Sequence, residues 1–229
     1  MSDRLVLGLD NSLDFLNLAL GEEGRLIEER HSRQDRHPSE VLAKRVQELL
    51  EDHGFFPKDL DLLFITLGPG SFTGIRVGLA FCKGLAEGLH IPILGVPTLD
   101  VLAAPLGFLE GTYLCPLVDA KKGEVFFALY QAKKEAAIRV SDFYSLKPEE
   151  VASKIAGPCL CFGSGVRLCR RELEGIQGLT IVDNGPVRIS GEALLKTGLA
   201  HSVHTDRYEI VPIYGRRSEA EIKFNIDIS

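Results

Sequence analysis

The sequence has no surplus of positive charge. Its 229 residues carry 26 Lys and Arg against 32 Asp and Glu, which gives a formal net charge of -6. A protein that neutralises the phosphates of a nucleic acid needs an excess of Lys and Arg. We therefore do not expect this chain to be the main contact of a nucleic-acid backbone. If RNA is involved, we expect another subunit to hold it.

Long apolar runs and a cysteine-pairing pattern are also missing. No run approaches the roughly 18 apolar residues that cross a bilayer, so we expect no membrane role. The five cysteines are an odd number and lie mostly in apolar runs, and no signal peptide precedes the first predicted strand. We expect reduced core thiols in a cytoplasmic protein. These cysteines are Cys82, Cys115, Cys159, Cys161 and Cys169.

Several motifs of catalytic and metal sites are absent. The loop 68–74 lacks the Gly-Lys-Ser/Thr ending of a P-loop, although binding of an anion at the following helix stays open. Ser164 lies in Gly-Ser-Gly rather than in a Gly-x-Ser-x-Gly elbow, which favours a strand-to-helix turn over a hydrolase nucleophile. His201 and His204 are three residues apart with Asp206 nearby. We interpret them as a solvated helix end rather than a metal site.

A hairpin pattern occurs twice in the chain. Short apolar runs at 5–10 and 15–20 predict a first hairpin, and runs at 114–119 and 125–130 predict a second. Placing Asp10 on Asp119 superimposes the second strands without a gap, at an offset close to half the chain. We predict two similar lobes, residues 1–105 and 106–229, divided near Pro105 and Gly107.

The remaining pattern alternates strands with helices. This alternation predicts an α/β fold in which helices cover mixed sheets. We expect residues 206–229 to form a polar tail on the surface. Predicted helices are 39–53, 72–89, 98–104, 147–155 and 167–174, and further predicted strands are 60–67, 91–97, 137–145 and 159–162.

The predicted helix 72–89 is unusually apolar and rich in glycine. Arg76, Lys83 and Glu87 form one narrow polar stripe, so we expect the helix to be covered on nearly every side. Each interior glycine costs roughly 1 kcal/mol relative to Ala. The spacing of Ala80, Gly84 and Gly88 makes a smooth ridge that another backbone can approach closely. The ridge could face a partner or pack against the protein's own sheet, and both alternatives stay open.

Several segments together resemble the TsaB family, also called YeaZ. They are Leu-Asp-Asn-Ser12, the glycine-rich stretch 67–80, 83–86, 95–100, 119–125 and 214–221, in the family's order and over most of the chain. The sequence departs from the family pattern at Asn11, at the proline in 37–40 and at Gly215.

The resemblance implies a duplicated ribonuclease-H-like fold of the actin and sugar-kinase superfamily. It also implies a non-catalytic dimerisation subunit that pairs with a catalytic TsaD-type relative and a TsaE-type ATPase. Such a complex transfers threonylcarbamoyl to the adenosine beside the anticodon of transfer RNA, so we expect tRNA contact only through the complex and a homodimer when the chain is alone. We expect no catalytic, cofactor-binding or metal-binding residues. The expected partner-binding residues are Phe72, Thr73, Arg76, Val77, Ala80, Phe81, Lys83, Gly84, Glu87 and Gly88.

Asp10 and Asp119 are the natural candidates for chemistry, because the superfamily's catalytic members use a hairpin aspartate to hold metal and phosphate. Both could equally be turn formers that bond their own backbone, which is the interpretation we favour. The superfamily's Gly-Gly adenosine loop is missing, and so is the His-x-x-x-His helix of the catalytic relative. A small-molecule or acyl kinase is thus the first alternative function, and a peptidase the second.

Overall fold

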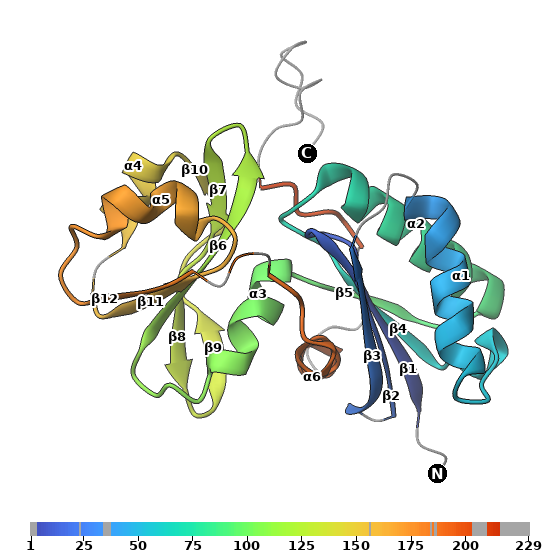
Figure 1. Cartoon of the computed structure of the whole chain (residues 1–229). Coiled ribbons are helices and arrows are strands. Elements are labelled where there is room, and N and C mark those ends of the chain that lie inside the picture. Colours follow the sequence, from blue (N-terminus) through green and yellow to red (C-terminus); the bar gives the residue numbers. More distant parts are fainter. Residues whose placement is uncertain are drawn as a thin grey trace.

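The computed structural model describes residues 4–22, 24–33, 38–155, 157–183, 185, 187–202 and 210–215. They form two mixed β-sheets side by side (Figure 1). The first sheet has the order β3-β2-β1-β4-β5, with β1 parallel to β4 and antiparallel to β2. Its strands are β1 (Leu5–Asp10), β2 (Phe15–Glu22), β3 (Arg25–Arg33), β4 (Leu62–Thr66) and β5 (Ile93–Val96).

The second sheet repeats this topology as β10-β7-β6-β11-β12, with an extra hairpin of β8 and β9 paired to β6. This repetition confirms the predicted duplication and the α/β fold class. Its strands are β6 (Tyr113–Lys121), β7 (Glu124–Phe127), β8 (Tyr130–Lys133), β9 (Ala136–Arg139), β10 (Tyr144–Leu146), β11 (Cys159–Phe162) and β12 (Leu179–Val182).

Helices cover both sheets. Two of them, α1 and α2, pack on the outer face of the first sheet over one apolar core, and α4 and α5 cover the second sheet in the same way. The helices are α1 (Pro38–Glu51), α2 (Phe72–Leu89), α3 (Thr98–Ala103), α4 (Pro148–Lys154), α5 (Val166–Leu173) and α6 (Gly191–Ser202), with short 3-10 turns η1 (Pro57–Asp59) and η2 (Ala104–Leu106).

The last helix of each half packs against the other half. The chain places α3 beside β6 of the second sheet, whereas α6 returns to lie on β1, β2, β3 and β5 of the first (Figure 1). A single apolar core therefore contains residues of both sheets, such as Phe64 and Phe126, together with Leu99 of α3 and Leu194 of α6. The predicted boundary between residues 105 and 106 falls in η2. It separates the two sheets, but one apolar core continues across it.

Two sequence predictions in the second half are wrong in detail. The predicted strand 125–130 is two strands, β7 and β8, and the predicted strand 137–145 is β9 and β10, which pair with different neighbours. The predicted superposition of the two hairpins without a gap is also wrong by one residue. Asp10 pairs with Asn17, whereas Asp119 pairs with Val125, because the second hairpin is one residue shorter and carries a register shift after Asp119.

Candidate functional site: the exposed face of α2

A serine cap and a left-handed end define α2. Ser71 is the N-cap, and its side chain accepts a hydrogen bond from the Gly74 amide at 3.2 Å. This bond satisfies one of the free amides of the first turn. His90 ends the helix in the left-handed conformation, with φ of 57°.

One side of α2 packs closely on the first sheet. A Cβ added at Gly78 would lie 3.2 Å from both Leu9 and Ile65, so the glycine is required by the approach of the helix to β1 and β4. The buried residues of the helix are Gly74, Ile75, Gly78, Leu79, Cys82 and Ala86.

The opposite side of α2 is open in the single chain, so within the described residues the expected cover is supplied only on the side of the sheet. Ala80, Gly84 and Gly88 are all exposed, and a Cβ added at Gly84 or Gly88 would meet nothing within 4 Å. The alternative that this ridge packs on the protein's own sheet is therefore wrong. Of the expected partner-binding residues, Phe72, Thr73, Arg76, Lys83 and Glu87 are also exposed, and Val77 and Phe81 are half-buried.

The C-terminal segment 210–215 contacts the first turns of α2. The Ile213 amide donates to the Leu67 carbonyl at 2.8 Å, and the Tyr214 ring lies 4.8 Å from that of Phe72. The Arg76 guanidinium lies 3.9 Å over the Phe72 ring, and its Nε donates to the Tyr214 hydroxyl at 3.1 Å. Sequence reasoning placed a tail on the surface but did not identify this contact. Residues 206–209 and 216–229 of that predicted tail lie outside the described residues.

A buried polar network holds the start of α2 against the first hairpin. Asn11 donates to the Gly74 carbonyl at 3.0 Å, and the Ser71 amide donates to the Ser12 carbonyl at 2.7 Å. A Cβ at Gly70 would collide with that same carbonyl. The position of the exposed face is thus fixed from within the first lobe.

Asp10 is the centre of this network and is completely buried. Its carboxylate accepts hydrogen bonds from the Ser12 amide and hydroxyl, from Thr66 at 2.6 Å and from Asn17 at 2.6 Å. Burial raises the pKa of the Asp10 carboxyl, and the bonds from Ser12, Thr66 and Asn17 oppose that rise. The bond to its own second neighbour matches the turn interpretation.

Asp119 has the equivalent place in the second hairpin. It accepts from the Lys121 amide at 2.7 Å, and its own amide donates to Ser164 Oγ at 3.1 Å. Ser164 lies between β11 and α5, as the strand-to-helix interpretation predicts. Asp119, like Asp10, bonds a backbone amide two residues on.

The other candidates from the sequence are dispersed. The five cysteines are buried and free, as predicted, and burial raises the pKa of Cys82 to about 12. His201 lies 3.8 Å from Asp100, whereas His204 and Asp206 lie outside the described residues. In the described part of the chain, no three His, Cys, Asp or Glu side chains gather as a metal-binding group. No helix there is long and apolar enough to span a bilayer.

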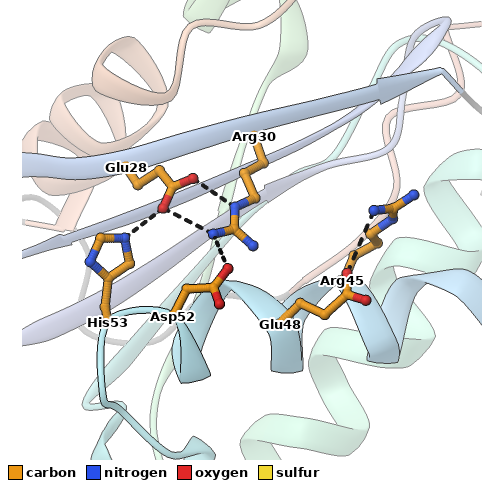
Figure 2. A network of polar contacts seen from close by, with 6 residues as sticks. All are labelled: Glu28, Arg30, Arg45, Glu48, Asp52 and His53. Atoms are coloured by element: carbon orange, nitrogen blue, oxygen red, sulfur yellow. Dashed lines mark hydrogen bonds and ion pairs between the residues drawn. The ribbon is translucent and has the colours of Figure 1, made fainter.

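An ion network joins β3 to the end of α1 (Figure 2). Glu28 binds Arg30 in a bidentate pair at 2.7 and 3.0 Å, Arg30 binds Asp52 at 2.7 Å, and His53 lies 2.5 Å from Glu28. Beside the network is a hollow of about 180 Å³ lined by Leu18, Arg30, His31, Ser32 and Arg45. Ligand pockets usually measure at least about 300 Å³, so we assign this network a structural role.

Comparison with known proteins identifies the family. A family model described as "TsaD: tRNA N6-adenosine threonylcarbamoyltransferase" matches residues 26–157. The "tRNA threonylcarbamoyladenosine biosynthesis protein TsaB" of Bacillus subtilis is 30% identical and covers 96% of this chain, which spans 97% of that relative.

Solved structures agree with this assignment. "YeaZ from Pseudomonas aeruginosa" has a TM-score of 0.76 at 25% identity, over 92% of this chain and 99% of its own. A second structure, an "uncharacterized protein with similarity to peptidase YEAZ from Pseudomonas aeruginosa", has a TM-score of 0.78 at 25% identity, over 93% and 100%. The chain therefore has the duplicated ribonuclease-H-like fold of actin-like proteins and belongs to the TsaB (YeaZ) family of tRNA threonylcarbamoyladenosine biosynthesis proteins.

Proposed function

We propose that this chain is a non-catalytic scaffold subunit of the machinery that forms N6-threonylcarbamoyladenosine in tRNA. It binds a TsaD-type catalytic subunit through the exposed face of α2, and a TsaE-type ATPase joins the pair. The tRNA is bound only through the complex. When the chain is alone, the same face binds a second copy.

The exposed glycines of α2 carry this proposal. Gly84 and Gly88 each cost the helix roughly 1 kcal/mol, and within the described residues neither glycine has a packing contact that would require it. A smooth ridge with no intramolecular neighbour fits close approach by another helix. The exposed ring of Phe72 and the half-buried side chains of Val77 and Phe81 add apolar area of the kind that an interface buries.

Two observations support the non-catalytic part of the proposal. Both oxygens of Asp10 are already hydrogen bonded inside the first lobe, and the side chain is fully buried. Asp119 is bonded to Lys121 through both oxygens. The two hairpin carboxylates therefore serve local structure.

The test measures binding and transfer in the reconstituted system. Gly84→Arg places a bulky charge on the ridge and should weaken binding to the TsaD-type subunit at least tenfold, because an unpaired charge would be buried at the contact. Threonylcarbamoyl transfer to tRNA should fall in parallel. Gly175→Arg is the matched control, because Gly175 is exposed in the second lobe and its Cβ would also meet nothing within 4 Å.

Circular dichroism must show that both variants remain folded. Unchanged affinity of folded Gly84→Arg would place the interface elsewhere. Transfer or ATP hydrolysis by the isolated chain, abolished by Asp10→Ala, would contradict the non-catalytic assignment.

A further inference from the structure

Two arginines line the hollow of about 180 Å³ between the edge strand β3 and helix α1. Arg30 belongs to β3 and Arg45 to α1, and Figure 2 shows both side chains between the strand and the helix. Ser32 shares the face of β3 that carries Arg30, because side chains two residues apart in a strand point to the same side. The arginine hollow, which we define as Leu18, Arg30, Ser32 and Arg45, therefore combines two positive charges with a hydroxyl group.

Arg30 is fixed in place and still has donors to offer. Its Nε and Nη2 bond Glu28, and Nη2 also bonds Asp52 at 2.7 Å. No described residue accepts a hydrogen bond from its Nη1. Because three hydrogen bonds already order the side chain, Arg30 loses little freedom when its remaining nitrogen binds a ligand.

Arg45 and Ser32 supply the other donors. Nη1 of Arg45 lies 3.5 Å from a Glu48 oxygen, and in the described part of the chain nothing accepts a hydrogen bond from its Nε or Nη2. The Ser32 hydroxyl has no hydrogen-bond partner there either. The fifth residue at the hollow, His31, directs its ring to the opposite face of β3, where it contacts Asn17 and Glu29. The available polar groups of the hollow are thus N–H and O–H donors.

The size and the donors of the hollow select a small oxyanion. Guanidinium groups bind the oxygens of phosphate through paired, charge-assisted hydrogen bonds. The hollow is smaller than the roughly 300 Å³ of ordinary ligand pockets, so a whole nucleotide does not fit inside it. A phosphate group needs only about two to three times the ~30 Å³ that one water occupies in the liquid. Leu18, which is paired with Arg30 in the sheet and is buried, lines the hollow on the side of β2.

We propose that the arginine hollow binds a phosphate group, held by Nη1 of Arg30, the guanidinium of Arg45 and the hydroxyl of Ser32. The bound group joins β3 to α1 beside the existing pair of Arg30 and Asp52. Glu48 competes for Arg45 and limits the affinity. The site lies apart from the exposed face of α2, and the inference does not depend on the proposed function.

Calorimetric titration of the isolated full chain tests the site. The probe is orthophosphate, with sodium chloride at matched ionic strength as the blank. R45Q removes one guanidinium and should weaken binding at least about tenfold, and S32A should weaken it about threefold. R171Q is the matched control and should bind as the native chain does, because Arg171 is an exposed arginine of α5 in the second lobe.

A substitution that strengthens binding gives a sharper test. E48Q removes the carboxylate beside Arg45 and should tighten phosphate binding about threefold. E51Q removes the same charge from the same helix, but Glu51 is exposed, bonds Gln47 and does not line the hollow. It should change the affinity less than E48Q does. Equal effects of E48Q and E51Q would show that only the net charge matters, which contradicts a site at Arg45.

Two further measurements locate the ligand and its source. Phosphate stabilises many proteins by exclusion from their surface, so its effect on the melting temperature is compared between the native chain and R45Q. Amide exchange in β3 and α1 should slow with phosphate in the native chain and not in R45Q. Methyl phosphate distinguishes the sources. An affinity equal to that of orthophosphate assigns the site to the terminal phosphate of a larger ligand, and a weaker one assigns it to the free ion.

Three results would overturn the proposal. They are a native chain that binds no phosphate, R45Q and S32A variants that bind it as tightly as the native chain, and acetate that binds as tightly as phosphate. Melting in chloride shows which variants are folded. If R45Q does not fold, S32A and E48Q still decide the outcome, because neither residue belongs to the bonds that fix Arg30.

Discussion

A chain of polar side chains runs from the buried Asp10 to the surface of the first lobe. Asn17 donates to Asp10 and contacts His31 at 2.6 Å, and His31 lies 3.2 Å from Glu29. Glu29 in turn accepts from the Gly191 amide at 2.6 Å, at the start of α6. One side chain in the first hairpin is therefore connected to a helix that comes nearly two hundred residues later in the sequence.

Glu28 provides a residue-scale test of pH dependence. Its bonds with Arg30, followed by the contact with His53, hold the pKa of the carboxyl at about 2, below its usual value of 4.5. A lowered folded-state pKa adds stability above pH 4.5, and that stability is lost as the pH falls toward 2. Because the pair is partly exposed, Glu28→Gln should cost only about 1 kcal/mol at neutral pH.

The measurement is urea unfolding of the native and Glu28→Gln proteins from pH 7 to pH 2.5. The difference in unfolding free energy should shrink as the pH falls below 4.5. Asp14→Asn is the control, because Asp14 is exposed and has no ion pair in the described chain. A difference that stays constant over this range would show that Glu28 acts through packing and not through its charge.

At the scale of the element, α2 contains glycines with opposite roles. Gly84→Ala should raise the unfolding free energy by up to about 1 kcal/mol, since alanine favours the helix and its Cβ meets nothing. Gly78→Ala should lower it by about 1 kcal/mol or more, because the Cβ would press against Leu9 and Ile65.

Melting temperature and partner affinity should therefore change in opposite directions for Gly84→Ala. The stabilised variant should bind the TsaD-type subunit more weakly, because the methyl group separates the two backbones. Stabilisation with unchanged affinity would count against close packing at this position.

Helices and strands whose apolar residues recur at a regular spacing could be predicted from the sequence, and those without such a spacing could not. The first hairpin, α1, β4 and α2 follow their predicted ranges closely. β3 was not predicted, because six of its nine residues are Arg, Glu or His and it is only half-buried at the sheet edge. β12 and α6 were also not predicted.

The candidate site was predictable in part for the same reason. Helical periodicity predicts that Arg76, Lys83 and Glu87 lie on one side of α2, and it identifies the ridge of small residues. It does not indicate which apolar residues of the helix the sheet covers. The contact between Tyr214 and Phe72 depends on residues far apart in the sequence, so no local pattern indicates it.

At the scale of the whole molecule, α3 of the first half packs on the second sheet and α6 of the second half packs on the first sheet. This reciprocal packing should make the two halves unfold together. Leu194 of α6 is fully buried and contacts Gly8 and other residues of the shared core. Leu194→Ala should cost about 2–5 kcal/mol. Because α6 covers the first sheet, amide hydrogen exchange should accelerate in β1 and β2 although the substitution lies in the second half.

Calorimetry should show a single transition for the native protein and for Leu194→Ala, at a lower temperature in the variant. Leu168→Ala is the control, since Leu168 is an exposed leucine of α5 in the second lobe. Two separate transitions, or faster exchange confined to the second half, would contradict cooperative unfolding.

The return of α6 to the first sheet also sets an order of events on the ribosome. All five strands of that sheet have been synthesised by Val96, but the helix that covers its inner face begins only at Gly191. At about 5–20 residues per second, the intervening chain takes roughly 5–20 s to make. For that period Phe64 and the small residues of β1 and β2 lack the cover that α6 later supplies. The nascent first lobe is then a substrate for chaperones, and synonymous codon changes between these positions should alter the yield of native protein without altering its sequence.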